Sequence, residues 1–383
     1  MRIAILTTDN REHHRKYELT APYFGTAIEA VLQGLAEIPE CEIHVISCTQ
    51  QPMHAPCKLA ENTWFHLLHV PKIGWLRTGY QGCLRAIRRK LRELQPDIVH
   101  GEGTERECAL SAAYSGFSSV VTVHGNMSEL SRLVDASVGS YLWSAAVLER
   151  FALSRTGGVL CNSAYTESVV RRRCHRTWRV PNALRRTFFE PLPAVSASHR
   201  NAKLLNVGVI EARKRQLELL KLAEKLHRLG HRFELQFIGA ADSRDPYVTA
   251  FQRQVENAES SGFASYLGEK SLPDLISLMD SASALVHVPS EESFGLVVAE
   301  ALARNLKFFG THVGGIPDIT GGVEGAELFR LEDEPALTTA IRQWLKADCP
   351  RPKTAAREMR LRYRPEVIAK RHAEIYAEVS KAS

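Results

Sequence analysis

The sequence predicts an α/β protein made of two doubly wound domains in tandem, and three observations support this. Short apolar runs alternate with helix-length amphipathic segments along the whole chain, as expected for βαβ units whose right-handed crossovers build a parallel sheet covered on both faces. The alternation lapses once, where two prolines and a Ser/Ala run occupy residues 186–200, and then restarts. The 383 residues are enough for two domains, each with a core of its own.

The first domain, residues 1–185, is expected to contain five strands and at least two helices. Apolar runs predict the strands at 2–6, 42–47, 97–101, 119–124 and 158–162, and amphipathic stretches predict the helices at 26–38 and 80–94. Residues 186–200 are interpreted as the linker between the two domains.

The second domain, residues 201–363, repeats the pattern. Strands are expected at 203–210, 233–240, 284–290 and 306–311, and helices at 215–229, 246–260, 272–280 and 295–304. Residues 364–383 form one further helix, because apolar positions recur there at helical spacing. Two doubly wound domains predict a ligand site in the crevice between them, at the carboxyl ends of their strands.

The composition indicates a soluble globular protein, with 44% hydrophobic and 24% charged residues. The net charge of +6 belongs to residues 1–200, which hold 24 Lys and Arg against 18 Asp and Glu, whereas the rest of the chain holds 25 of each sign. Two clusters of bases are interpreted either as solvated helix faces or as attraction to an anionic membrane surface or a phosphate-bearing acceptor. Nucleic acid is not expected as a partner, because few aromatic residues interleave with the bases and no motif for reading it is present. The clusters are Arg85, Arg88, Arg89, Lys90 and Arg92, and Arg171, Arg172, Arg173, Arg176, Arg179, Arg185 and Arg186.

Eight cysteines are scattered without CxxC spacing, which favours buried, reduced thiols over a disulfide framework or a zinc site. The N-terminal run MRIAILTT is too short for a signal peptide, and no stretch approaches the roughly 18 apolar residues of a membrane span. We therefore expect a cytoplasmic protein, either free or peripheral at the cytoplasmic face of a membrane.

The segment 288–304, VPSEESFGLVVAEALAR, combines a strand end, a loop and a helix start. Gly295 lets a ligand approach the backbone, and the free amides of the first helical turn favour a phosphate. Glu292 lies in the loop, and Glu300 lies about 7.5 Å along the helix from Gly295, at about 1.5 Å per residue. The two carboxylates either bind hydroxyl groups on both sides of a diphosphate or are an unrelated loop glutamate and surface helix glutamate.

Glu292 and Glu300, with seven residues between them, resemble the E-x7-E signature of the family-4 GT-B retaining glycosyltransferases. The likeness extends over nearly the whole chain, in family order. It implies the GT-B fold, in which two Rossmann-like domains face each other across a cleft and the C-terminal helix returns to the first domain. The other similar segments are DIVHGEG (97–103), TVHG (122–125), LCNSAYT (160–166), VPNAL (180–184), FIGA (237–240), YLGEKSLPDLISLMDSASALVHVPS (266–290), GTHVGGIPDI (310–319) and RPEVIAKRHAEIYAEV (364–379).

The resemblance also implies roles for the residues of the 288–304 segment. Glu292 would bind hydroxyl groups of the transferred sugar, and Glu300 would bind the ribose hydroxyls of the nucleotide. The backbone of Phe294, Gly295 and Leu296 would hold the sugar and the diphosphate.

The diphosphate of such a donor needs fixed cations. Lys214, in NVGVIEARKRQLELL (206–220), falls at the family's lysine position, but Val209 stands where the family usually has an arginine. Arg213 or Arg215 would then replace that arginine, and Gly208 belongs to the same donor-binding set.

Two features of the first domain are also assigned to the site. His124, at the strand end in TVHG, would hydrogen-bond the donor sugar as a neutral imidazole, although a histidine at a strand end is often structural. The loop from Thr8 to Thr26 is long for a βα connection, so we expect it to be functional. The family generally has a glycine pair there. This chain has only Gly25, so Phe24, Gly25 and Thr26 are assigned to the acceptor side.

The implied reaction is a hexosyl transfer that retains the anomeric configuration. The donor would be a nucleotide diphosphate sugar, UDP-sugar before GDP-sugar, and the acceptor a hydroxyl group of a sugar, a lipid-linked molecule or another compound. The leaving phosphate itself would take the acceptor proton, with no metal and no further cofactor. The alternative with the same fold is a sugar phosphorylase that uses phosphate as the acceptor. A nicotinamide-dependent oxidoreductase also has paired βαβ domains, but neither domain of this chain begins with GxGxxG.

Overall fold

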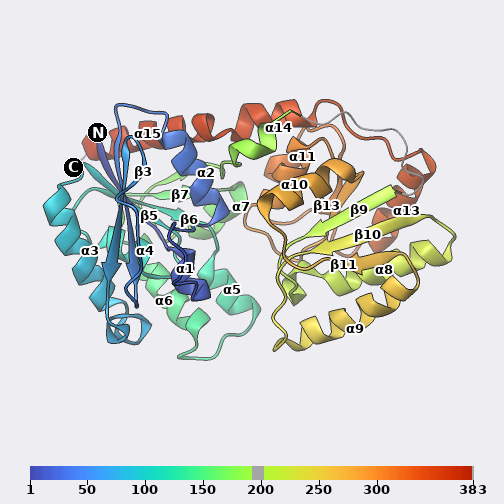
Figure 1. Cartoon of the computed structure of the whole chain (residues 1–383), viewed down its shortest axis with the longest axis horizontal. Helices are drawn as coiled ribbons and strands as arrows, with labels where there is room; N and C mark the ends of the chain where they lie inside the picture. Colours follow the sequence, from blue (N-terminus) through green and yellow to red (C-terminus); the bar gives the residue numbers. More distant parts are fainter. Residues whose placement is uncertain (192–201, 382–383) are drawn as a thin grey trace. The chain divides into compact units, whose positions relative to one another are not determined.

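The computed structural model describes residues 1–191 and 202–381, and the chain divides into two compact units (Figure 1). Unit 1 comprises Met1–Arg186 and Tyr363–Ser383, and unit 2 comprises Thr187–Arg362. The expected linker at 186–200 begins as the 3-10 helix η3 (Arg186–Phe189), in which Phe188 and Phe189 are buried. Its residues 192–200 lie outside the described part of the chain.

Unit 1 is built on an eight-stranded sheet with the order β3-β4-β2-β1-β5-β6-β7-β8. Neighbouring strands are parallel, except that β3 pairs antiparallel with β4 at one edge. The strands are β1 (Arg2–Leu6), β2 (Glu42–Thr49), β3 (Lys58–Ala60), β4 (Thr63–His69), β5 (Ile98–Glu102), β6 (Ser119–Val123), β7 (Val159–Cys161) and β8 (Thr177–Arg179). The helices are α1 (Asn10–His14), α2 (Thr26–Leu35), α3 (Gln81–Leu94), α4 (Glu107–Ala113), α5 (Met127–Leu133), α6 (Tyr141–Leu153), α7 (Ala164–Val170) and α15 (Pro365–Lys381), with the 3-10 helices η1 (Lys72–Gly74) and η2 (Leu76–Thr78).

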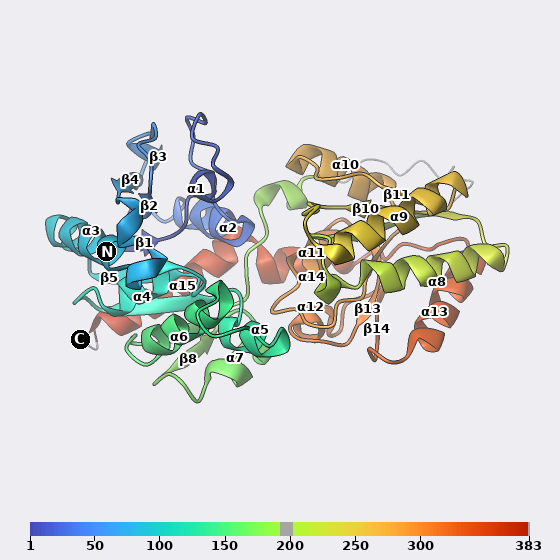
Figure 2. The same cartoon turned by 90° about the horizontal axis from the view of Figure 1, so that it is seen from below.

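The central strands of unit 1 are apolar on both faces because alternate side chains enter two separate cores. On β1, Ala4 and Leu6 join the core shared with α3, α4 and α6, whereas Ile3 and Ile5 join the core shared with α2 and α15. This period of two explains the continuous apolar run RIAIL in the sequence. The layers can be followed from two directions in Figures 1 and 2.

The C-terminal helix α15 packs against α2 of unit 1, although it follows unit 2 in the sequence. Gly34 of α2 makes this close packing possible, since a Cβ at that position would lie 2.1 Å from the carbonyl oxygen of Pro365. The return of the last helix to the first unit is therefore confirmed.

Unit 2 is built on a six-stranded sheet, parallel throughout, with the order β11-β10-β9-β12-β13-β14. The strands are β9 (Ala202–Val207), β10 (Phe233–Ile238), β11 (Ala264–Tyr266), β12 (Ala284–His287), β13 (Lys307–Thr311) and β14 (Ala326–Phe329). The helices are α8 (Gln216–Arg228), α9 (Pro246–Ser260), α10 (Leu272–Ser281), α11 (Leu296–Ala303), α12 (Ile316–Thr320), α13 (Glu334–Lys346) and α14 (Ala355–Tyr363), with the 3-10 helix η4 (Ala212–Lys214).

The predicted fold class is confirmed: both units are α/β with a doubly wound, mainly parallel sheet. Each strand and helix expected from the sequence overlaps one in the structure, whereas β3, β4, β8, β11 and β14 were not expected. Three of those strands have only three residues, and β4 mixes buried and half-buried side chains, so none of these produces a long apolar run. Among the described residues, no helix combines the length and apolar character needed to cross a membrane.

Candidate active site

In unit 2 the order of the strands reverses between β9 and β12, which pair in parallel at the centre of the sheet. Open α/β sheets bind ligands at the carboxyl ends of the strands beside such a reversal, because the loops that follow turn to opposite faces and leave a crevice. Lys214 lies in the segment after β9, and Glu292 lies in the loop after β12. The reversal thus brings together the two donor-binding segments predicted from the sequence.

Hydrogen bonds of Arg213 connect these two segments. The Ser290 amide donates to the Arg213 carbonyl at 2.8 Å, and Arg213 Nη1 donates to the carbonyl and carboxylate oxygens of Glu291 at 3.0 and 3.1 Å. Arg213 Nη2 donates to Glu211 Oε1 at 2.6 Å. The Arg213 guanidinium therefore bridges the two segments and is paired with two carboxylates.

Lys214 and Glu292 form an ion pair between the same two segments, and both side chains are largely buried. His287, the last residue of β12, places Nε2 3.3 Å from Glu292 Oε2. Burial by itself would raise the pKa of Glu292, but His287 and the Lys214 ammonium group outweigh burial and hold that pKa well below its usual value. Burial lowers the pKa of His287, so its ring is neutral and donates to Glu292 through Nε2.

The glycine turn after β13 holds the backbone of Glu292. The Gly315 amide donates to the Glu292 carbonyl at 2.9 Å, and Gly314 has a φ of 55°. A Cβ on Gly314 would lie 1.7 Å from the same carbonyl oxygen, so this close approach requires glycine.

The helix α11 begins beside this pair. Gly295 precedes it with a φ of 97° and provides no side-chain cap, so the first amides of α11 and its positive dipole end face the loop that carries Glu292. Phe294 is buried under this turn. Glu300 is only 5% exposed on α11, which argues against the interpretation as a surface helix glutamate.

The remaining donor-side residues also lie after β9. Gly208 follows the strand with open space where a Cβ would point, and the Val209 side chain is half-exposed. Arg215 precedes α8, with Nη1 3.4 Å from the Leu331 carbonyl and Nε 3.9 Å from the Glu218 carboxylate. Arg213 already has two carboxylate partners, so Arg215 is the less strongly paired of the two candidates for the arginine absent at position 209. That Arg213 or Arg215 takes the role of the family's arginine stays a prediction.

In unit 1 the strand order reverses between β1 and β5, and Glu102 is the last residue of β5. The Glu102 carboxylate is buried, with Oε2 2.9 Å from Nε2 of His124, which follows β6, and Oε1 3.4 Å from Nδ1 of His100. Both nitrogens of His100 also contact hydroxyl groups, Nδ1 that of Tyr376 at 2.6 Å and Nε2 that of Thr122 at 2.7 Å.

The charges of this cluster concentrate on Glu102 and His124. Burial would raise the pKa of Glu102, but His100 and the hydrogen-bonded His124 hold it down at about 2. Burial lowers the pKa of His100 to about 4, so that ring is neutral. Burial would also lower the pKa of His124, yet Glu102 and Glu105 outweigh burial and raise it. The contact with Glu102 therefore stabilises the protonated form of His124, whereas the sequence led us to expect a neutral imidazole.

His100, Glu102 and His372 have the composition of a metal site, and their ligand atoms lie within 4.8 Å of one another. However, both nitrogens of His100 already face hydroxyl groups. We therefore assign His100, together with His124, to holding Glu102 in place.

Two family models match adjoining parts of the chain. The model described as Glycosyltransferase Family 4 matches residues 25–185, and the model described as Glycosyl transferases group 1 matches residues 190–362. The chain belongs to the family-4 GT-B glycosyltransferases. No curated protein sequence matches it significantly.

Solved structures with the GT-B fold resemble this glycosyltransferase over its full length. The sucrose-phosphate synthase of Thermosynechococcus elongatus has a TM-score of 0.77 at 17% identity and covers 100% of both chains. HepE of Anabaena, solved with UDP and glucose, has a TM-score of 0.70 at 15% identity and covers 98% of this chain and 99% of its own. A glycosyltransferase of Rickettsia africae has a TM-score of 0.69 at 14% identity and covers 100% of this chain and 99% of its own. At these identities the likeness shows a common fold.

The acceptor-side residues predicted in this glycosyltransferase lie at the start of α2. The Phe24 ring is buried and packs edge-on against Phe65 in the core, so its side chain is structural rather than available to an acceptor. Gly25 precedes α2 with a φ of −64° and open space where a Cβ would point, so nothing in the backbone requires glycine there. Thr26 is the first residue of α2.

The long loop before α2 is more ordered than the sequence indicates. It contains α1, and Arg11 of α1 is fully buried. The Arg11 guanidinium pairs with Asp9 and donates to the carbonyls of Leu19 and His54 at 2.7 and 2.8 Å. These bonds hold the loop against the segment after β2.

The two basic clusters differ in their surroundings. In the cluster at 171–186, five arginines form ion pairs within unit 1: Arg173 with Glu149, Arg176 with Glu378, Arg179 with Glu167, Arg185 with Glu29, and Arg186 with Glu37 and Glu366. The cluster at 85–92 lies on α3, whose apolar residues face the core, and among the described residues only Arg89 and Lys90 of that cluster form an ion pair, both with Glu93 of the same helix. Ion pairs thus explain most of the second cluster, and attraction of an anionic acceptor or membrane to α3 stays a prediction.

Sequence reasoning assigned no role to Glu102, the carboxylate closest to His124. The only signal was its place in DIVHGEG at a strand end, since its contact with His124 depends on the parallel pairing of β5 and β6. Arg213 was expected to face the diphosphate, and its two carboxylate partners could not be read from its spacing.

The Glu102–His124 contact predicts that Glu102→Gln lowers the pKa of His124 from above its ordinary value of 6.5 to below it, because burial remains after the charge is lost. Nuclear magnetic resonance titration of the histidine ring protons measures this, with exposed His69 as the internal reference. Since the folded-state pKa of His124 is raised, the contact stabilises the wild type below the unfolded pKa, and this contribution is lost as pH rises through the folded pKa. A wild-type His124 that titrates at or below 6.5 would contradict the assignment.

Proposed function

We propose that this glycosyltransferase moves a hexose from a UDP-sugar to a hydroxyl group of an acceptor and retains the anomeric configuration. The observation that carries the proposal is the Lys214–Glu292 ion pair beside the uncapped start of α11. Structures of HepE, which has the same fold, contain UDP, UDP-glucose, or UDP and glucose, and this favours uridine over guanosine. The acceptor is a sugar, a lipid-linked molecule or another hydroxyl compound, and the positive charge of residues 1–200 favours an anionic one.

The donor contacts follow from the chemistry of the described groups. Glu292 is ionised and can accept hydrogen bonds from sugar hydroxyls, and Glu300 takes the corresponding role for the ribose. The Lys214 ammonium exchanges part of its contact with Glu292 for the diphosphate. The amides at the start of α11, around Gly295 and Leu296, stabilise the same anion.

In the proposed reaction, the bond between the anomeric carbon and the diphosphate oxygen breaks, and the acceptor oxygen bonds to that carbon on the same face. The departing phosphate oxygen takes the proton of the acceptor hydroxyl, so no protein side chain becomes covalently modified. Negative charge develops on the diphosphate, where Lys214 and the α11 amides are already oriented to stabilise it. These groups support catalysis without a metal or further cofactor.

His124 is proposed to act as a donor rather than an acceptor of hydrogen bonds. With Nε2–H directed to Glu102, a protonated ring has one further N–H group, on Nδ1, for a substrate oxygen. A positively charged ring would also attract an anionic ligand such as the donor more strongly than an uncharged ligand. Glu102 and His124 would then act together as a hydrogen-bonded pair.

Replacing Glu292 with Ala is expected to lower the turnover of UDP-sugar by at least about a hundredfold, because the bound sugar loses its charged acceptor. Release of UDP in the presence of candidate acceptors measures the effect. Glu256→Ala, which removes an exposed glutamate of α9, is the matched control and should retain full turnover. Thermal unfolding of both variants separates a loss of chemistry from a loss of folding. Wild-type turnover of the Glu292→Ala variant with any nucleotide sugar would contradict the proposal.

Replacing Lys214 with Ala is expected to weaken the binding of UDP far more than that of uridine, because only UDP carries the phosphates that the ammonium group contacts. A loss of one charge-assisted hydrogen bond corresponds to about 1.5–3 kcal/mol, or roughly 10- to 150-fold in the dissociation constant. Isothermal titration calorimetry with both ligands measures it, and Lys221→Ala on the exposed side of α8 is the control. Equal losses for UDP and uridine would show that Lys214 acts elsewhere.

A further inference from the structure

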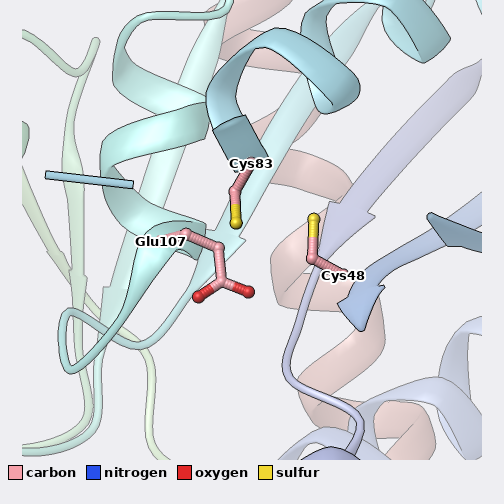
Figure 3. A group of neighbouring side chains, drawn as sticks. All are labelled: Cys48, Cys83 and Glu107. Carbon is pink, nitrogen blue, oxygen red and sulfur yellow. The ribbon is translucent and has the colours of Figure 1, made fainter. Parts of the chain in front are cut away.

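Three side chains of metal-ligating types, none of them part of the Glu102–His124 cluster, meet in the interior of unit 1. Cys48 lies on β2, Cys83 on α3, and Glu107 is the first residue of α4. Their sulfur and carboxylate oxygen atoms all lie within 4.8 Å of one another, and Figure 3 shows the two thiols and the carboxylate as neighbours. All three residues are buried, with exposures of 3%, 0% and 1%.

We propose that Cys48, Cys83 and Glu107 bind one thiophilic divalent cation, with Zn²⁺ as the ion that their chemistry fits best. Zinc accepts cysteine sulfur at about 2.3 Å and carboxylate oxygen at about 2.0–2.2 Å in tetrahedral geometry, which sets the two sulfurs about 3.8 Å apart. The observed spacing therefore requires only small side-chain movements. Two thiolates exclude Mg²⁺ and Ca²⁺, which prefer oxygen ligands throughout.

The state of Glu107 is a second observation that points to a cation. Its Oε2 atom is buried and accepts no hydrogen bond from the described residues. The nearest charge is Arg106, whose Nε lies 3.8 Å from that oxygen, beyond hydrogen-bonding distance. A buried carboxylate oxygen without a hydrogen-bond donor is costly, and coordination to a cation would satisfy it.

The charges of the site balance when a divalent ion is bound. Binding releases the two thiol protons to solvent, which leaves two thiolates and one carboxylate around a doubly charged cation. The single negative charge that remains is offset by Arg106, which also stacks over the Trp75 ring at 5.1 Å. The surrounding core of unit 1 is apolar, and an apolar core encloses charged groups at low cost only when their charges cancel. The cation, its three ligands and Arg106 together carry no net charge.

A cation at this place would be structural rather than catalytic. It would join β2, α3 and α4, and Glu107 lies only five residues after Glu102, with the turn 103–106 between them. The ion would thus hold the far end of the turn 103–106, which follows directly after Glu102. The three ligands are far apart in the sequence and lack CxxC spacing, which is why the sequence favoured buried, reduced thiols over a zinc site.

The test uses the full chain, freed of metal with a chelator under reducing conditions and then titrated with Co²⁺. Binding at this site is expected to give about one equivalent per chain, with the near-ultraviolet absorption of thiolate-to-cobalt charge transfer. Cys48→Ser, Cys83→Ser and Glu107→Gln should each weaken Co²⁺ binding by at least about tenfold, and the first two should also reduce the absorption band. Cys161→Ser, which alters a buried cysteine of β7 outside the cluster, should bind as the wild type does.

A second measurement needs no variant. In the unaltered protein, Zn²⁺ should slow the alkylation of Cys48 and Cys83 during partial unfolding, relative to Cys161, as followed by mass spectrometry of the peptides. The proposal is overturned if Co²⁺ does not bind, or if binding persists unchanged in the cluster variants. It is also overturned if Zn²⁺ protects Cys161 as much as the cluster. None of these readouts depends on glycosyl transfer, so the proposed function and the cation site stand or fall separately.

Discussion

The Lys214–Glu292 ion pair is the interaction on which the organisation of the donor site depends. Both charges are largely buried in the segments that follow two adjacent parallel strands, and each would be costly without the other. The neighbouring contacts all act on the same two segments. Arg213 connects them, His287 donates to Glu292, and Gly314 allows the glycine turn to hold the Glu292 backbone. The strand reversal brings the segments together, and the ion pair determines which charges they present.

Unit 1 uses the same topological position for a second carboxylate. Glu102 ends β5, next to β1 at the strand reversal, and its hydrogen-bond partner is His124 rather than a lysine. In each unit, then, a carboxylate lies at or after the carboxyl end of the first strand beyond the reversal, and it contacts a basic side chain from a neighbouring segment. A doubly wound sheet favours this arrangement because the crevice at the reversal admits polar side chains while the strands on either side are covered by helices.

Much of the fold could be predicted because both units follow rules that depend on local pattern. Continuous apolar runs such as RIAIL identify strands buried on both faces, and 246–260 identifies α9 without error at either end. Short strands such as β3 and β8 leave no such pattern. The proximity of Glu292 and Lys214 was also accessible, because each lies in a motif that resembles one of the family.

The partners of those residues were not accessible, because they depend on tertiary contacts between distant segments. Nothing in the local sequence shows that Arg213 is paired with Glu211 and Glu291, that Glu102 meets His124, or that Cys48 and Cys83 lie together. For Phe24 the local sequence indicated a contact that the structure does not favour. Its place beside Gly25 indicated an acceptor contact, whereas the ring packs in the core against Phe65. The charge state of His124 likewise follows from a neighbour contributed by another strand.

The central claim is that Lys214 serves the diphosphate while Glu292 serves the sugar, and that each restrains the other before the donor binds. The most direct test is the affinity for UDP, which has no sugar, in Lys214→Ala and Glu292→Ala, measured by isothermal titration calorimetry. The two changes should act in opposite directions. Lys214→Ala should weaken UDP binding, and Glu292→Ala should leave it unchanged or strengthen it, because the ammonium group is freed for the phosphates. If Glu292→Ala weakened UDP binding as much as Lys214→Ala does, the division of roles between the two residues would be wrong.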